Sequence, residues 1–191
     1  MRARVTTLAA ASSRTAKLYG VEIVAAGLGE GDVLRELHVA TWAVTYRDRL
    51  PRGWYRERLA AHRARDWGEI VRCRTAGGGG VLTARCVNRM VGLCEYGPSE
   101  DGDDDPGRVG HIHRLYVDPA RQRTGIGRSL LTASTDRLRE SGMSAATLWV
   151  LERDERARSF YERVGWKPDG KRKSEPMTDA ITDLRYRVVL V

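Results

Sequence analysis

Two glycines, Gly125 and Gly127, lie in the segment of this 191-residue chain that points most directly to chemistry, LYVDPARQRTGIGRS (residues 115–129). The segment is typical of a strand, a turn at Asp118-Pro119 and a loop that opens directly into a helix. Glycines at i and i+2 let the backbone approach a ligand closely, and the first turn of a helix offers unpaired N–H groups and the positive end of its dipole. The pattern predicts an anion site suited to a pyrophosphate.

Two common phosphate-binding motifs do not fit this loop. A GxGxxG dinucleotide motif needs a third glycine where the chain has Leu130, and a P-loop needs Gly-Lys where Arg128-Ser129 follow Gly127. The glycine run 77–80 also lacks a following Lys-Ser/Thr, so we expect a hairpin or linker there.

The loop instead resembles the pyrophosphate loop of the GNAT N-acetyltransferase superfamily, which has the pattern Gln122-x-x-Gly125-x-Gly127. The strand HIHRLYVDP (residues 111–119) precedes it, and VLERDERARSFYERVGW (residues 150–166) follows at the expected distance. The likeness extends over about residues 21–191 and is specific from about 111 to 166.

This resemblance implies that acetyl-CoA binds as co-substrate, without a metal, in a splay between the strand ending at Val117 and the strand ending near Leu151. The strand backbone would pair with the pantetheine arm, and the amides of residues 123–128 would wrap the pyrophosphate. Asp154 stands where the family most often has Asn. The carboxylate of Asp154 replaces the donor of the Asn amide by an acceptor. The implied cofactor contacts are Leu115, Tyr116, Val117, Gln122, Arg123, Thr124, Gly125, Ile126, Gly127, Arg128, Ser129, Asp154, Ala157 and Tyr161.

The reaction needs an acid. Acetyl transfer from a thioester expels a thiolate, whose conjugate acid has a pKa of about 8.5, and a phenol held near the sulfur can supply the proton. The resemblance implies that Tyr161 is this general acid. The alternative is that Phe160-Tyr161 only packs its helix onto the sheet.

The reaction also needs a base, because a protonated amine, with a pKa of about 10.4 for a lysine-like group, has no lone pair for attack. We expect His111 and His113 to lie on one face of a strand together with Leu115 and Val117, and either histidine can be the base. Glu95, on the preceding strand, is the third candidate, and a structural role is the alternative for all three. The Val117 N–H would meet the oxyanion of the tetrahedral intermediate.

The elements that must position these residues alternate along the chain. We expect strands at residues 21–26, 81–86, 90–96, 111–117, 145–151 and 184–191, with the second and third joined by Asn88-Arg89. We expect a helix capped by Asp32 that ends before Pro51, with Val33, Leu37, Ala40 and Val44 on its apolar face, and further helices at residues 52–64, 125–140 and 154–164.

The fold class predicted from these elements and the resemblance is α/β (α+β). It has a mixed, mostly antiparallel sheet of about six to seven strands, splayed at the acetyl-CoA site and covered by helices on both faces. Residues 19–191 would form one acetyltransferase domain, and residues 1–18 a flexible basic arm. Aromatic residues around Trp42 and Tyr46 would pack as core or line an acceptor pocket.

The net charge of +8 suggests a nucleic-acid partner. Its distribution argues against one, since the arginines are spread along the chain and the densest charge run, residues 100–105, is acidic. That run, with Asp101, Asp103, Asp104 and Asp105, would either attract a cationic acceptor or form a solvated loop.

The sequence therefore predicts an N-acetyltransferase that acts on the primary amine of a small molecule, such as a polyamine or an aminoglycoside, in a ternary complex. The alternatives are acetylation of a peptide or protein N-terminus, a non-catalytic CoA-binding module and a basic nucleic-acid-binding module. No apolar run reaches the roughly 18 residues of a membrane span. Three cysteines without a CxxC pair are typical of a reducing compartment, so we expect a cytoplasmic protein. The resemblance makes a homodimer the default state.

Overall fold

The computed structural model describes residues 20–175 and 178–190; the predicted arm at residues 1–18 lies outside the described residues. Seven strands form one sheet in the order β1-β2-β3-β4-β5-β7-β6. The strands are β1 (Val21–Ala25), β2 (Gly80–Cys86), β3 (Arg89–Pro98), β4 (Val109–Val117), β5 (Ala145–Leu151), β6 (Lys167–Glu175) and β7 (Thr178–Val189). The helices are α1 (Gly31–Tyr46), α2 (Arg52–Arg63), α3 (Trp67–Ala76), α4 (Ile126–Glu140) and α5 (Glu155–Arg163).

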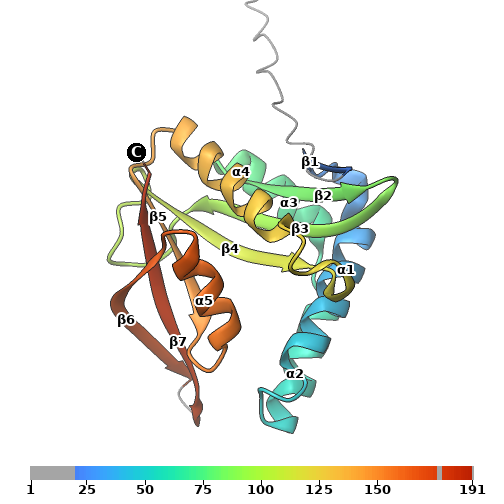
Figure 1. Ribbon diagram of the computed structural model, residues 1–191, viewed down its shortest axis with the longest axis vertical. Helices are drawn as coiled ribbons and strands as arrows, with labels where there is room; N and C mark the ends of the chain where they lie inside the picture. The colour runs from blue at the N-terminus through green and yellow to red at the C-terminus, as the bar shows by residue number, and fades with distance from the viewer. Residues whose placement is uncertain (1–19, 176–177, 191) are drawn as a thin grey trace, which may run out of the picture.

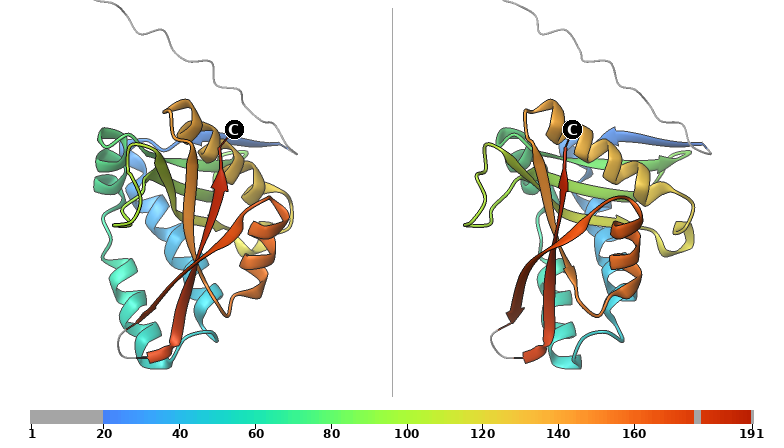
Figure 2. Two further views of the ribbon diagram at one scale, coloured as in Figure 1. Left: turned by 90° about the vertical axis from the view of Figure 1, so that its left-hand side faces the viewer. Right: turned by 60° about the vertical axis from the view of Figure 1, so that its left-hand side comes forward.

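Helices cover both faces of the sheet, as predicted (Figure 1 and Figure 2). α4 and α5 lie on one face, above a core that includes Ile112, Leu130, Leu138 and Leu148. α1 and α3 lie on the other face, and α2 packs against α1. Among the described residues, no helix is long and apolar enough to cross a membrane.

The sheet divides between β4 and β5, which pair in parallel over only four residues each. Val109–Ile112 lies opposite Ala145–Leu148, and β4 has no partner in β5 beyond Ile112. Figure 1 shows the two strands together at the upper left and diverging below, with α5 in front of the opening. We call the region between residues 113–117 and 149–151 the splay, and its presence confirms the predicted fold class.

A β-bulge in β4 lies at the start of the splay. Glu95 of β3 pairs with Arg114, but the next residue, Tyr96, pairs with Ile112. His113 is therefore the extra residue, and the alternation of side chains between the two faces shifts there.

Because of this bulge, the predicted orientation of His111 and His113 is wrong. Leu115 and Val117 belong to the core beneath α4. The His111 and His113 rings lie 4.8 Å apart, and His113 Nε2 approaches Gly97 beside Arg74 of α3. The two histidines thus lie on the α3 face, opposite Leu115 and Val117, because the bulge breaks the period of two.

The buried face of α1 also differs from the predicted one. Val33 and Val44 are 48% and 60% exposed. The helix begins at Gly31, so Asp32 lies in its first turn and does not cap it. Hydrophobic periodicity misassigned the face because two of the four buried side chains are polar: Leu34, His38, Thr41 and Trp42.

Two elements were not predicted. Asp66 caps α3 by accepting a hydrogen bond from the Glu69 N–H at 3.0 Å, and this D-x-x-E signal was present in the sequence. β6 (KPDGKRKSE) is an edge strand that pairs only with β7, and its polar sequence carries no apolar alternation.

The β2–β3 turn lies at Val87-Asn88 and not at the predicted Asn88-Arg89, because Arg89 already pairs with Cys86.

Candidate active site

The free edge of β4 directs two backbone donors into the splay. The Asp118 N–H donates to the Val91 carbonyl at 2.9 Å, and hydrogen-bonded positions alternate along an antiparallel pair. The N–H groups of Leu115 and Val117 therefore point away from β3, toward the side where β5 has diverged. The Tyr116 N–H points toward β3, so its predicted backbone contact with an extended ligand is not available.

The loop after β4 leaves the first amides of α4 without side-chain acceptors. Arg123 and Gly125 have left-handed φ angles of 66° and 88°, which turn the chain sharply into the helix. Gly125 is the N-cap, and no side chain caps the helix. The first N–H groups of α4 and the positive end of its dipole are thus available to an anion.

Side chains of this loop have three different environments. Arg123 and Arg128 are exposed beside the helix start. Ile126 is buried in the core and offers only its N–H to a ligand. Gln122 donates from Nε2 to the Val117 carbonyl at 3.1 Å, which fixes the loop against the strand edge.

Asp154 has a structural role that accounts for its residue type. It is the N-cap of α5 and accepts a hydrogen bond from the Ala157 N–H at 3.1 Å. Its side chain is 8% exposed, and Arg49, just after α1, lies 3.8 Å from it. Asp and Asn are both favoured N-caps, so the departure from the family pattern keeps the cap and adds an ion pair between α1 and α5.

Three tyrosines from different elements lie near one another: Tyr46 on α1, Tyr116 on β4 and Tyr161 on α5. Burial, together with the negative charges that Tyr116, Asp154 and Tyr161 can carry, raises the pKa of Tyr46. Burial is also the largest cause of the raised pKa of Tyr161. The Tyr161 phenol is therefore protonated at neutral pH, the state in which it can donate a proton.

His111 is held in place by Thr147 of β5. The Thr147 hydroxyl donates to the Gly110 carbonyl at 3.3 Å and lies 2.8 Å from His111 Nδ1. This contact fixes the orientation of the His111 ring, and Nδ1 is the ring nitrogen that it uses. Burial lowers the His111 pKa to about 4, so the ring is neutral at pH 7.

The tautomer of His113 follows from its two ring nitrogens having different surroundings. It bonds to the backbone of Pro98, whose nitrogen has no hydrogen, so the ring is the donor. His113 Nε2 is buried without a partner among the described residues. Nδ1 therefore makes the bond, and Nε2 carries an unused lone pair on the α3 face, near Gly97 and Arg74. Burial, with His111 and Arg74 nearby, lowers the His113 pKa to about 3.

Glu95 is the least available of the three predicted bases. It is 1% exposed, Arg74 Nε donates to one of its oxygens at 2.8 Å, and Arg114 donates to the other. Burial raises its pKa while Arg74 opposes that change. Both oxygens already bind a guanidinium, so the geometry favours a structural role.

Four of the five acids of the acidic loop are paired with arginines, which reduces the charge that the loop offers to a cation. Arg185, 3% exposed, lies 3.2 Å from Asp101, 2.8 Å from Asp103 and 3.6 Å from Asp104. Glu100 pairs with Arg74 at 2.5 Å. The loop is bound to β7 and α3 by these contacts.

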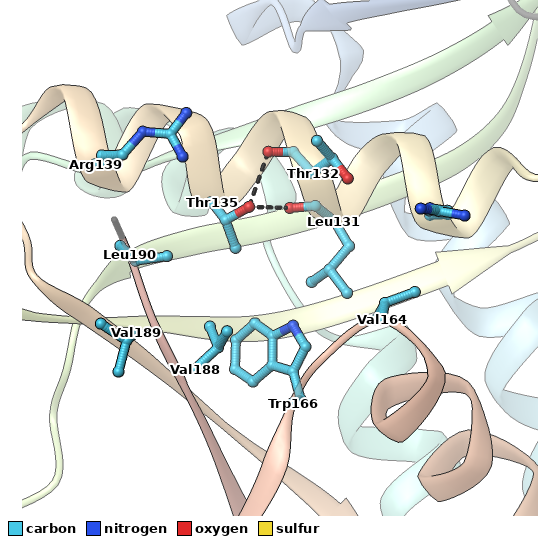
Figure 3. A pocket seen from close by; sticks show the side chains of 10 residues that line it. Leu131, Thr132, Thr135, Arg139, Val164, Trp166, Val188, Val189 and Leu190 are labelled. Atoms are coloured by element: carbon cyan, nitrogen blue, oxygen red, sulfur yellow. Dashed lines mark hydrogen bonds between the residues drawn. The ribbon is translucent and has the colours of Figure 1, made fainter.

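A groove of about 150 Å³ runs along α4, opposite the end of β7. Figure 3 shows Leu131, Trp166 and Val188 on its walls, and the Thr135 hydroxyl bonded to the carbonyls of Leu131 and Thr132. It contains neither the histidines nor Tyr161, so it is separate from the chemistry. Among the described residues, no cluster of His, Cys, Asp and Glu could hold a metal ion.

Tyr46, Arg49 and Thr147 belong to this site but were not predicted as site residues. Tyr46 was visible only as part of an aromatic cluster with Trp42. Thr147 gains its role by lying opposite His111 in the parallel pair, which periodicity cannot show.

A sequence profile of the acetyltransferase (GNAT) family matches residues 35–166. Among curated relatives, the mycothiol acetyltransferase of Streptosporangium roseum is 34% identical over 79 residues, which cover 41% of this chain and 23% of that protein. The uncharacterized N-acetyltransferase YuaI of Bacillus subtilis is 26% identical over 122 residues, covering 63% of this chain and 66% of that protein. The matches span between 23% and 34% of the first four mycothiol acetyltransferases.

Solved structures share the fold. PaiA N-acetyltransferase of Thermoplasma acidophilum, in complex with coenzyme A, is 21% identical with a TM-score of 0.64, covering 86% of this chain and 97% of that chain. YncA of Salmonella typhimurium, with its cofactor acetyl-CoA, is 18% identical with a TM-score of 0.66, covering 90% of this chain and 94% of that chain. The profile match spans more than half of the residues, and the chain therefore belongs to the acetyltransferase (GNAT) family.

Proposed function

We propose that this protein transfers the acetyl group of acetyl-CoA directly to the primary amine of a small molecule, in a ternary complex. The observation that carries the proposal is the splay, where the N–H groups of Leu115 and Val117 lie next to the uncapped start of α4. An extended thioester arm ending in a pyrophosphate matches this pair of backbone sites.

In the proposed mechanism, the amine nitrogen attacks the thioester carbonyl and loses its proton to a base. The Val117 N–H stabilises the negative oxygen of the tetrahedral intermediate. When the C–S bond breaks, Tyr161 donates its proton to the leaving sulfur, which gives free CoA thiol and the amide. The proton taken from the amine returns through solvent to the phenolate, so the cycle closes.

We propose His113 as the base, with His111 as the ring that positions it. His113 lies at the bulge beside the splay and keeps an unused lone pair on Nε2, whereas both Glu95 oxygens bind arginines. The low pKa keeps His113 unprotonated at neutral pH, and it can take the amine proton directly or through one water.

Replacing His113 by Ala should lower kcat by roughly 10²-fold or more, the usual loss when a general base is removed. Acetyl-CoA affinity should stay within a few-fold of wild type, since His113 contacts the acceptor amine. His111→Ala is the matched variant and should cost less. Steady-state kinetics with acetyl-CoA titrations measure both. A larger loss in His111→Ala than in His113→Ala would reverse the two roles.

The acceptor class is supported by the relatives named mycothiol acetyltransferase, whose name refers to a small molecule and not to a polypeptide. The charge argument for a polyamine or an aminoglycoside is weaker than predicted, because four of the five acids of the loop are paired with arginines. A cytoplasmic location and a homodimer rest on the sequence alone and stay part of this proposal.

The test is a screen of released CoA thiol with amino acids, their amides, polyamines, aminoglycosides and short peptides as acceptors. Thiol release with at least one small amine, and an acetylated product by mass spectrometry, is the expected result. Turnover restricted to peptides would replace the small-molecule acceptor by a polypeptide N-terminus. Binding of acetyl-CoA without any transfer would indicate a non-catalytic module.

A further inference from the structure

α1 lies against β3 and β4 on the sheet face opposite α5, and α2 packs against α1. We call α1, α2 and the turn at residues 64–66 the acceptor wall. Residues 31–66, which include the whole wall, contain eight arginines and five acids. Four of the five acids in the loop after β3 are paired with Arg185, Arg187 or Arg74: Glu100, Asp101, Asp103 and Asp104. The acceptor wall therefore has a surplus of positive charge.

Three polar atoms of this wall are buried without a partner among the described residues: His38 Nε2, Thr41 Oγ1 and His62 Nδ1. His38 is 0% exposed, and its Nδ1 accepts from Trp67 at 3.3 Å, so Nε2 carries the ring proton. Its ring centroid lies 4.6 Å from that of His62 and 4.8 Å from that of Tyr116 of β4. A buried donor without an acceptor is unfavourable, so a ligand group that accepts a hydrogen bond from it is favoured.

Arg65 adds a charge at the same place. It lies in the turn between α2 and α3 and is partly buried, and its N–H donates to the His62 carbonyl at 3.4 Å. No carboxylate among residues 20–175 and 178–190 forms an ion pair with it, although its charge acts to lower the pKa of Glu95, which burial raises. The charge of Arg65 lowers the pKa values of His38 and His62, so its guanidinium lies within electrostatic reach of both rings.

We infer that the acceptor carries a carboxylate as well as its amine, and that Arg65 binds this carboxylate at the acceptor wall. The inference rests on the proposed acetyl transfer to a small amine and narrows its acceptor. A guanidinium suits a carboxylate because its planar fork can donate two parallel hydrogen bonds. The unpaired Nε2–H of His38 is a second hydrogen-bond donor and likewise favours an anionic group.

The experiment compares three acceptors that differ only in this group: an amino acid, its primary amide and its decarboxylated amine. Lysine with lysinamide and cadaverine, and tyrosine with tyrosinamide and tyramine, are suitable sets. For at least one set we expect kcat/KM to be at least tenfold higher for the amino acid. Arg65→Gln should abolish that preference by raising KM for the amino acid alone, whereas Arg63→Gln, at an exposed position of α2, should keep it.

Equal or better turnover of the amide and the decarboxylated amine in wild-type protein would overturn the inference, as would a panel in which no amino acid reacts. Loss of the preference in both variants would also overturn it, because the general charge of the wall would then be responsible. If the inference fails in any of these ways, turnover of cadaverine or an aminoglycoside would still support the proposed acetyl transfer. The absence of any thiol release would instead count against the proposed function.

Discussion

Tyr161→Phe should lower kcat by roughly 10²- to 10⁴-fold while acetyl-CoA affinity stays nearly unchanged, because general acid catalysis contributes about that much. The substitution removes one hydroxyl and keeps the ring that packs against Phe160 and Trp166. The raised pKa of Tyr161 makes the phenol a proton donor at neutral pH. Without it, the thiolate must leave without a proton from the protein.

A neighbouring phenol supplies the control. The Tyr186 ring centroid lies 6.4 Å from that of Tyr161, and the Tyr186 hydroxyl donates to Glu162 at 2.7 Å. Tyr186→Phe should lower stability by about 1 kcal/mol, the net value of a typical hydrogen bond, with kcat within a few-fold of wild type. Single-turnover and steady-state rates for both variants make the comparison. An unchanged kcat in Tyr161→Phe would remove this residue from catalysis.

Arg185→Met should destabilise the protein by about 3–5 kcal/mol, because removing one partner of a buried ion cluster leaves uncompensated charges. Arg185 is 3% exposed and is 2.7 Å from Asp169 and 2.8 Å from Asp103. Asp104, whose side chain is also 3% exposed, would keep only Arg187 as its cationic partner. The denaturation midpoint in urea measures the loss.

Arg172→Met is the matched control on β6. The Arg172 side chain is 59% exposed and pairs with Glu152 at 2.9 Å. Exposed ion pairs contribute about 0–1 kcal/mol, so this variant should remain close to wild type. A loss below about 1 kcal/mol in Arg185→Met would mean that the loop after β3 does not depend on the cluster.

Much of the fold was predictable because its apolar periods are strong. β5 has the predicted bounds, and Ile126, Leu130, Ser134 and Leu138 are buried along α4 as expected. The glycine pattern also located the uncapped helix start. These features depend on local spacing, which one sequence displays directly.

The remaining features depend on contacts between distant segments. The bulge at His113 exists only in the register between β3 and β4, so the face of the histidines could not be predicted. Arg185 and the acidic residues are more than 80 positions apart in the chain, and the sequence gives no sign of their pairing. The buried face of α1 was mispredicted because two of its buried residues, His38 and Thr41, are polar and interrupt the apolar spacing.

The central claim is that acetyl-CoA binds in the splay with its pyrophosphate at the start of α4. A Cβ on Gly127 would be 3.6 Å from Val117 and 3.7 Å from Phe160, which is ordinary contact, so variants at this position should fold. Gly127→Ala is the steric control, whereas Gly127→Glu adds a bulky anion where the phosphates would lie.

Thermal unfolding of the three proteins with and without acetyl-CoA is the most direct test. At a concentration of about 100 Kd, acetyl-CoA should stabilise wild-type protein by about 2.7 kcal/mol, which for a chain of this size raises Tm by about 5–10 °C. We expect most of this shift in Gly127→Ala and none in Gly127→Glu. No shift in wild-type protein at saturating acetyl-CoA, or an undiminished shift in Gly127→Glu, would contradict the account.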